Sequence, residues 1–294
     1  MARPGKLLVT GCRGQLGCDL VRMLSARYEV EGVDIEEVDI CNRDALVSLV
    51  NTCHPDVVIH AAAYTDVDGC ETNSELAMNV NGEGTRNVAK ACREIGARMI
   101  YYSTDYVFNG RKDSPYVEND PTSPQTVYGK SKLAGEQAVQ EMLKDYAILR
   151  IAWVYGRHGK NFVKTMLKLG KERAEAPDSE PLRVVDDQFG NPTWTEDIVR
   201  QTEVVIENNL RGIYHATSER EVSWFQFARD IFDLARIEVT VEPCTTGEFP
   251  RPAPRPRRSS LENAHLKAAG FNVMRDYREA LVEFMKQYAG ELAK

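Results

Sequence analysis

Tyr128 and Lys132 lie four residues apart in a stretch with helical periodicity. Residues at this spacing share one face of a helix, and an ammonium group beside a phenol stabilises the phenolate. We therefore expect Lys132 to lower the pKa of Tyr128 from its usual value of about 10. An exposed helical face is the alternative explanation of such a pair.

A hydroxyl-rich segment, Tyr102-Ser103-Thr104-Asp105-Tyr106, ends a predicted strand about 24 residues before Tyr128. The hydroxyl of Thr104 can hydrogen-bond the same reacting oxygen as the phenol of Tyr128. Together with a glycine-rich turn near the N-terminus, a threonine, a tyrosine and a lysine in this arrangement are improbable by chance.

A glycine-rich turn, Gly11-Cys12-Arg13-Gly14-Gln15-Leu16-Gly17, follows the predicted strand Lys6–Thr10. Glycines permit a tight turn and let backbone N–H groups approach a diphosphate at a helix N-terminus. Asp34 ends the next predicted strand, 23 residues after Gly11, where a carboxylate would meet an adenosine ribose hydroxyl. The pattern predicts a dinucleotide site. A plain strand–helix turn and an exposed loop aspartate are the alternatives.

The first half of the chain alternates short β-branched runs with amphipathic stretches. Because this alternation continues over about 150 residues, it predicts an α/β fold with a Rossmann-type, doubly wound parallel sheet. Leu16, Leu20 and Leu24 begin the first helix at helical spacing. The expected strands are Lys6–Thr10, Tyr28–Asp34, Asp56–Ala62, Arg98–Ser103 and Ala147–Val154, and the later helices are Arg43–Cys53, Ser74–Ile95 and Tyr128–Lys144.

The pattern changes after Gly156. We expect residues 1–155 to form the dinucleotide-binding domain and residues 156–294 to form mainly a smaller α/β substrate-binding lobe, with some later segments returning to the sheet. The expected elements of this part are a helix that starts at Phe162, helices over Trp224–Leu234 and Tyr277–Tyr288, and strands at Leu182–Val185 and Gly212–Ala216.

Composition narrows the functional classes. The 294 residues carry 37 basic and 44 acidic side chains, a net charge of −7, which gives no electrostatic support for nucleic-acid binding. The chain has no run of about 18 apolar residues and no signal peptide, so we expect a cytoplasmic protein that does not bind membranes. Seven cysteines without a C-x-x-C pair and five scattered histidines indicate neither a disulfide framework nor a zinc site.

Several longer motifs include the glycine turn and the Thr104, Tyr128 and Lys132 group, and they are spread along nearly the whole chain. Together they resemble the extended short-chain dehydrogenases/reductases and, within them, the dTDP-4-dehydrorhamnose reductases. The motifs are GCRGQLG, VIHAAAYTDVDGCE, YYSTDYVFNG, SPQTVYGKSKLAGE, LRIAWVYG, NFVKTML and DDQFGNPT.

The resemblance implies an enzyme that uses NADPH or NADH to reduce the C4 keto group of dTDP-4-dehydro-L-rhamnose to dTDP-L-rhamnose. This is the last step of dTDP-rhamnose biosynthesis. Two alternatives stay open: another nucleotide-sugar reductase or epimerase on the same scaffold, or a non-catalytic, cofactor-binding regulatory subunit. Either a monomer or a homodimer is compatible with the sequence.

The resemblance also implies roles for individual residues. The expected catalytic residues are Thr104, Tyr128 and Lys132. Sugar or substrate contacts are expected from Thr104, Asp105, Tyr128, Trp153 and Arg255. The expected cofactor contacts are Gly11, Arg13, Gly14, Gln15, Leu16, Gly17, Asp34, Asp39, Ile40, Ala62, Ala63, Tyr64, Thr65, Tyr128 and Lys132.

Two residues allow two explanations each. Trp153 is a sugar contact or a core residue, and Asn81 is catalytic or bridges backbone groups. Asp19 and Glu196 fall where some relatives hold magnesium at a dimer contact. No third acid matches near the C-terminus, so we do not predict a metal.

Cofactor choice depends on two opposed charges. Asp34 favours the ribose diol of NADH, whereas Arg13 in the glycine turn can pair with the 2′-phosphate of NADPH. We expect both cofactors to be used, with a preference of about tenfold or less.

Overall fold

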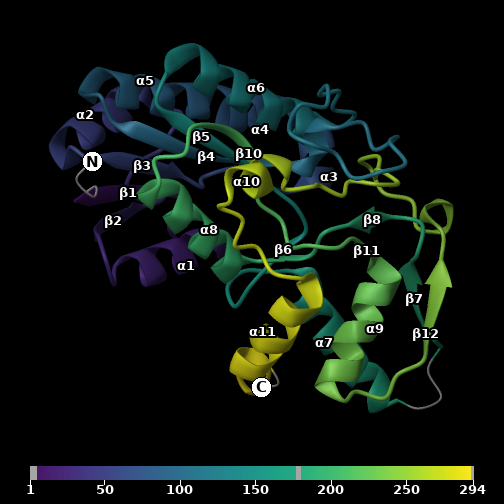
Figure 1. Ribbon diagram of the computed structural model, residues 1–294. Helices are drawn as coiled ribbons and strands as arrows, with labels where there is room; N and C mark the ends of the chain where they lie inside the picture. The colour runs from purple at the N-terminus through teal and green to yellow at the C-terminus, as the bar shows by residue number, and fades with distance from the viewer. Residues whose placement is uncertain (1–4, 177–179, 293–294) are drawn as a thin grey trace.

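The computed structural model describes residues 5–176 and 180–292, and a six-stranded parallel sheet lies at its centre (Figure 1). The strand order is β10-β5-β4-β3-β1-β2, which confirms the predicted Rossmann-type α/β fold. From β1 the chain adds β2 on one side and then β3, β4, β5 and β10 on the other. The strand order therefore reverses between β1 and β3, the switch point where such sheets bind ligands. The strands are β1 Lys6–Thr10, β2 Glu29–Val33, β3 Val57–His60, β4 Arg98–Thr104, β5 Tyr146–Ile151 and β10 Gly212–His215.

Helices cover both faces of this sheet, with α2, α5 and α6 above it and α1 and α8 below it in Figure 1. Side chains alternate along each strand, so Leu7 and Val9 of β1 pack with α1 and α8, while Leu8 packs on the opposite side. These strands are apolar on both faces because both faces are covered. The helices are α1 Gln15–Leu24, α2 Arg43–Cys53, α5 Thr85–Ile95, α6 Val127–Met142 and α8 Thr195–Glu207.

Two predicted elements are interrupted where they approach the end of the sheet. The helix expected over Ser74–Ile95 consists of α4 (Ser74–Met78), a π-helical turn η1 (Asn79–Gly84) and then α5. The strand expected over Ala147–Val154 stops at Ile151, and Trp153 takes a left-handed φ of 46° before β6 (Val154–Tyr155). The predictions of one continuous helix and one continuous strand are therefore wrong. Single π-turns and strained residues gather at functional sites.

The C-terminal half forms a second lobe with its own apolar core. Its small parallel pair, β7 with β12, lies at the right of Figure 1. Two segments return to the main sheet, since β10 extends it and α8 packs against α1. We propose that the division near residue 155 separates a cofactor domain from a substrate lobe. The further elements are α7 Phe162–Ala174, β7 Leu182–Val185, β8 Phe189–Gly190, β9 Thr193–Trp194, β11 Val222–Ser223, α9 Trp224–Ala235, β12 Val241–Cys244, η3 Thr246–Glu248, α10 Ala264–Ala269 and α11 Tyr277–Leu292.

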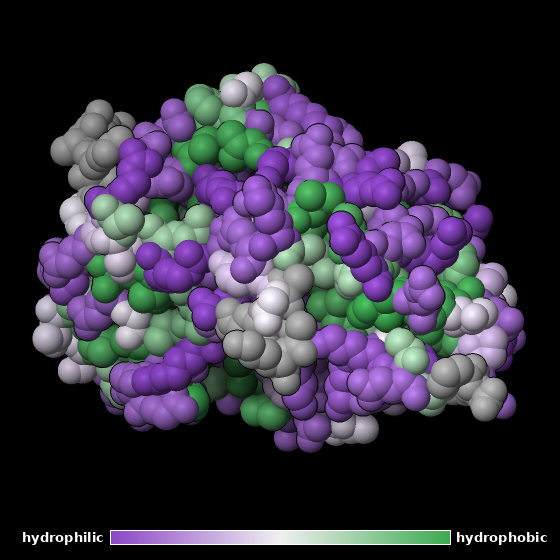
Figure 2. Space-filling model, turned by 90° about the horizontal axis from the view of Figure 1, so that it is seen from below, coloured by the Kyte–Doolittle hydropathy of each residue, from purple (hydrophilic) through white to green (hydrophobic). Residues whose placement is uncertain are grey.

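Polar side chains cover most of the face seen in Figure 2, and apolar residues appear there in small patches. Within the described ranges, no helix has the length and apolar character needed to cross a membrane. The seven cysteines are free thiols.

A buried ion pair fixes α6 to β5. Arg150 donates from Nε and Nη2 to the two carboxylate oxygens of Glu136, at 2.9 and 2.8 Å. The side chains are 3% and 0% exposed, and the guanidinium of Arg150 lies 5.1 Å from the ring centroid of Phe108. Removing one partner from such a pair leaves an uncompensated buried charge.

We therefore predict that Glu136→Gln lowers the free energy of unfolding by about 3 kcal/mol or more. Glu141→Gln is the matched control, because Glu141 lies on the same helix and pairs with Arg86 while 60% exposed. Exposed pairs contribute about 0–1 kcal/mol. Urea unfolding of both variants measures the difference, and similar losses would contradict the prediction.

Candidate active site

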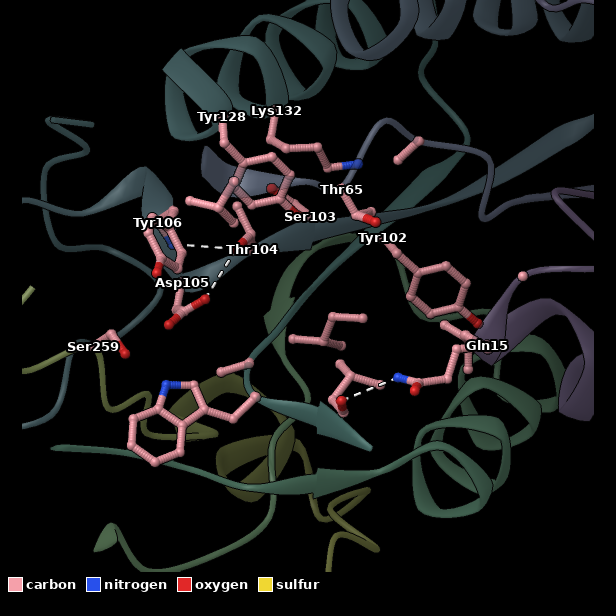
Figure 3. Close-up of a pocket in the computed structure, with 18 of the residues that line it drawn as sticks. Gln15, Thr65, Tyr102, Ser103, Thr104, Asp105, Tyr106, Tyr128, Lys132 and Ser259 are labelled. Carbon is pink, nitrogen blue, oxygen red and sulfur yellow. Dashed lines mark hydrogen bonds between the residues drawn. The ribbon is translucent and has the colours of Figure 1, made fainter. Parts of the chain in front are cut away.

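An elongated cleft runs along the carboxyl ends of the strands, between the sheet and the second lobe. Its inner part, about 470 Å³, is lined by the glycine turn, the end of β4, one face of α6 and residues of the second lobe (Figure 3). Its outer part, about 460 Å³, shares Gly11 and Gly14 with the inner part and reaches the end of β2. The glycine turn and the group of Thr104, Tyr128 and Lys132 are separate motifs in the sequence, and the fold brings them to one cleft.

The glycine turn packs too closely for side chains. A Cβ at Gly17 would lie 1.9 Å from the carbonyl oxygen of Gly11, and a Cβ at Gly11 (φ 71°) would lie 2.6 Å from the Ala62 nitrogen. Helix α1 starts directly after this turn, at the cleft. It has no side-chain cap and no acidic residue in its first turn. Free N–H groups at a helix N-terminus suit a diphosphate, so this cradle fits a dinucleotide.

The outer part of the cleft surrounds Asp34. Its Oδ2 accepts a hydrogen bond from the Arg13 N–H at 2.8 Å, and its Oδ1 accepts one from the Ile35 N–H at 2.9 Å. The guanidinium of Arg13 is already paired with Glu36 and Glu37, two partners that the sequence analysis did not anticipate. The other predicted cofactor contacts that line this part are Asp39, Ile40, Ala62, Ala63 and Tyr64.

The three predicted catalytic residues meet in the inner part, together with Gln15, Leu16 and Thr65. Thr126 caps α6 by accepting a hydrogen bond from the Gly129 N–H at 3.0 Å. This start of the helix places Tyr128 in the first turn and Lys132 one turn later, both above the end of β4, where Thr104 lies (Figure 3). The ammonium of Lys132 is 4.2 Å from the ring centroid of Tyr101.

The expected effect of Lys132 on the pKa of Tyr128 is wrong. Burial raises the pKa of the Tyr128 phenol above its ordinary value, and the charge of Asp105 adds to this rise. Burial also lowers the pKa of Lys132 to about 7, against the opposing charge of Glu136. Desolvation is the largest influence on the pKa of both groups. Tyr128 keeps its proton at neutral pH, and this is the form that a proton donor needs.

Asp105 and Thr104 form a buried hydrogen-bonded pair. The hydroxyl of Thr104 donates to Asp105 Oδ1 at 2.9 Å and accepts from the Tyr106 N–H at 3.2 Å. The second carboxylate oxygen of Asp105 is buried rather than open to the cleft, and the side chain of Ser259 interacts with the carboxylate. Burial raises the pKa of Asp105 to about 6.

Trp153 forms one wall of the cleft. Its indole stacks on Trp224, with ring centroids 3.4 Å apart and ring planes 3° apart. A Cβ on Gly190 would lie 2.3 Å from the indole of Trp153, so a glycine is needed there. Trp224, Gln188 and Ser259 also line the cleft, and the sequence analysis missed them. Trp224 opens a predicted helix at the same helical spacing as Phe227, Ala228 and Ile231, so its pattern alone did not mark it as a cleft residue.

Arg255 lies in the same wall, as predicted for a substrate contact. Its guanidinium pairs with Asp68 at 3.0 Å and donates to the Ala253 carbonyl at 3.0 Å. The side chain is 16% exposed. A half-buried guanidinium held in this way presents a fixed positive charge to the cleft.

Asn81 bridges backbone groups, the second of its two explanations. Its Oδ1 accepts from the Tyr64 N–H at 2.8 Å, and its Nδ2 donates to the Tyr64 carbonyl at 3.0 Å. The same Nδ2 donates to Ser131 Oγ at 2.9 Å, and Ser131 Oγ donates to the Tyr128 carbonyl at 2.8 Å. Asn81 therefore ties the segment after β3 to the first turn of α6.

Asp19 and Glu196 lie close together, with Arg22 between them. Arg22 Nη2 donates to Asp19 Oδ1 at 2.9 Å and to Glu196 Oε1 at 2.6 Å. Thr195 donates to the other oxygen of Asp19 at 2.6 Å. Residues 5–176 and 180–292 contain no group of three or more acids, cysteines or histidines that could hold a metal ion.

The sequence profile of the family described as "RmlD substrate binding domain" matches residues 5–289. The chain belongs to this family. A relative, the dTDP-4-dehydrorhamnose reductase of Burkholderia thailandensis, is 40% identical in an alignment of 293 positions that covers 94% of this chain and 96% of the relative. The resemblance seen in the motifs is thereby confirmed.

Two solved structures agree with this membership of the RmlD family. A dTDP-4-dehydrorhamnose reductase from Clostridium acetobutylicum superimposes with a TM-score of 0.93 at 42% identity and covers 97% of this chain and 99% of its own. The Bacillus anthracis enzyme, solved in complex with NADP, gives 0.92 at 39% identity and covers 98% and 100%. The fold of the RmlD family therefore extends over the whole described chain.

The raised pKa of Asp105 makes the free energy of unfolding depend on pH. A carboxyl whose pKa is higher in the folded state loses folding stability as pH rises from its unfolded value of 3.8 through about 6. We predict that Asp105→Asn increases the free energy of unfolding by about 3 kcal/mol at pH 8 and by about half of that at pH 5.

Urea unfolding at the two pH values tests this prediction. Asp113→Asn is the control, because the side chain of Asp113 is 96% exposed and its removal should leave stability nearly unchanged at both pH values. A gain from Asp105→Asn that does not depend on pH would show that burial of the charge is not its cause.

Proposed function

We propose that this chain is an NAD(P)H-dependent dTDP-4-dehydrorhamnose reductase. It reduces the C4 keto group of dTDP-4-dehydro-L-rhamnose to dTDP-L-rhamnose. The observation that carries the proposal is the meeting of Thr104, Tyr128 and Lys132 in one cleft with an uncapped glycine turn. Relatives about 40% identical over nearly their full length, named as reductases of this substrate, support the same assignment.

The chemistry follows from the groups that face the cleft. A bound nicotinamide cofactor supplies the hydride for C4. Tyr128 holds a proton on its phenol oxygen and donates it to the carbonyl oxygen of the sugar as negative charge develops there. Positioned acid catalysis of this kind is typically worth about 10²–10⁴ in rate. With a pKa lowered to about 7 by burial, Lys132 is partly protonated at neutral pH, and its ammonium form stabilises the negative charge that develops on the carbonyl oxygen.

Other side chains bind and orient the substrate in this proposal. The carboxylate of Asp105 accepts a sugar hydroxyl, and the face or edge of Trp153 packs against the sugar ring. Arg255 supplies a positive charge for the diphosphate of the substrate. Thr104 donates a hydrogen bond to Asp105 and so holds the acid in place; to hydrogen-bond the reacting carbonyl oxygen, Thr104 turns its single O–H from Asp105 to the substrate.

An absorbance assay at the reduced-nicotinamide band tests the reaction directly. The chain should oxidise the cofactor with dTDP-4-keto-6-deoxy sugars, and dTDP-4-dehydro-L-rhamnose should be the best substrate. No oxidation with any of these sugars would contradict the proposal and favour a regulatory subunit.

We predict that Tyr128→Phe keeps the fold and cofactor binding but lowers kcat by about 10²–10⁴. Thr104→Val should be milder, because water can replace part of the lost hydrogen bonding. Tyr106→Phe is the matched control, since its ring lies 5.7 Å from that of Tyr128 and it should keep most of the activity. A larger loss in Tyr106→Phe than in Tyr128→Phe would reassign the proton donor.

We also propose that both NADPH and NADH are used, with a preference of about tenfold or less. Asp34 suits a ribose diol, whereas Arg13 at the same end of the cleft suits a 2′-phosphate. Arg13→Ala should weaken NADPH more than NADH, and Asp34→Ala should do the reverse. Calorimetric titration of both cofactors against both variants measures this. Equal losses in the Arg13 variant would mean that its side chain does not distinguish the two cofactors.

A further inference from the structure

The short loop after β2 holds the guanidinium of Arg13 from two sides. Arg13 Nη1 lies 2.7 Å from Glu36 Oε2 and 2.7 Å from Glu37 Oε2. Arg13 Nη2 pairs with the other oxygen of Glu37. Both terminal nitrogens of the guanidinium are therefore engaged by carboxylates.

Glu37 is also anchored by the backbone of its own loop. Its Oε2 accepts a hydrogen bond from the Asp34 N–H at 2.9 Å. The Arg13 side chain and this N–H lower the pKa of Glu37 to about 2, so the carboxylate stays charged throughout the working pH range. The contact is thus a two-point pair with one partner held in place, rather than two mobile surface chains.

The ribose end of the cleft is acidic as a consequence. Among the described residues that line it, Arg13 is the only cation, while Asp34 and Asp39 are acids. Glu36 and Glu37 add two further negative charges beside Arg13. One positive charge is therefore set against four negative charges where the two cofactors differ, by a hydroxyl or a phosphate at the 2′ position.

An arginine binds a phosphate through the same planar fork of N–H donors that binds a carboxylate. A 2′-phosphate must compete with Glu36 and Glu37 for that fork. A 2′-hydroxyl needs only the carboxylate of Asp34, whose position is fixed by the Arg13 and Ile35 N–H groups.

We propose that Glu36 and Glu37 are specificity-determining residues, which hold the Arg13 guanidinium away from a 2′-phosphate and bias the chain toward NADH. The proposal rests on the nicotinamide-dependent function proposed above and adds a determinant outside the lining of the cleft. The bias is graded, because Arg13, Glu36 and Glu37 are 52%, 66% and 39% exposed and exposed pairs are individually weak.

The test is a double variant, Glu36→Gln with Glu37→Gln, which keeps the shape of both side chains and an acceptor for the Asp34 N–H. Calorimetry measures the affinities for NADPH and NADH, and also for 2′,5′-ADP and 5′-AMP, which carry the same difference without a nicotinamide. In the parent chain NADH should bind more tightly. The affinity ratio of the phosphorylated to the unphosphorylated ligand should rise about tenfold in the variant.

Two further variants separate release of Arg13 from a simple loss of negative charge. Glu29→Gln with Glu31→Gln also removes two negative charges, but from β2, the strand before the loop, where both acids pair with Lys6. This variant should leave the ratio within about twofold. In an Arg13→Ala background, Glu36→Gln with Glu37→Gln should raise the ratio by less than about threefold, since the gain depends on a guanidinium that can be released.

Three results would overturn the inference. The ratio could stay unchanged in the double variant, or the gain could be equally large without Arg13, which would mean plain repulsion by the two acids. In both cases the parent still binds the cofactors, and the proposed function stands. A parent chain that binds neither NADH nor NADPH would overturn the proposed function together with this inference.

Discussion

The contact between the glycine turn and the end of β3 is the constraint on which the rest of the site depends. The backbone at Gly11 approaches Ala62 so closely that no Cβ fits. The segment that begins at Ala62 continues to Tyr64, which Asn81 clamps through both its N–H and its carbonyl. Asn81 in turn reaches Ser131, one turn beyond Tyr128. An unbroken series of short contacts therefore connects the helix that would receive a diphosphate to the helix that carries the proton donor.

Desolvation, more than pairing of charges, sets the protonation states in the cleft. Tyr128, Lys132 and Asp105 are all buried, and in each case burial shifts the pKa in the direction that favours the uncharged side chain. A neutral phenol and a carboxyl that titrates near pH 6 are arranged around one hydroxyl, that of Thr104. The site resembles other active sites in this respect, because perturbed groups gather where chemistry requires them.

Local patterns in the sequence predicted what local geometry determines. The spacing of Tyr128 and Lys132 requires only a helix, and the glycine turn requires only a strand followed by a helix, so both were found from the sequence. The rest depends on contacts between distant segments. The two acids that hold Arg13, the stacking of Trp224 on Trp153 and the burial that reverses the expected pKa shift of Tyr128 are tertiary effects. Helix α8 has a helical pattern in Ile198, Val199, Val205 and Ile206, and it was missed because the second lobe interrupts the strand–helix alternation.

The wall of the cleft that contains Trp153 behaves as one unit. The left-handed backbone of Trp153, the absence of a Cβ at Gly190 and the parallel indole of Trp224 come from three separate segments, and all three bear on the position of one indole ring. A single replacement made to admit a larger or differently substituted sugar would leave the remaining two without their partner. Redesign of substrate scope must therefore treat positions 153, 190 and 224 as one module that is exchanged together, and natural variation in the sugar accepted should follow the same coupling.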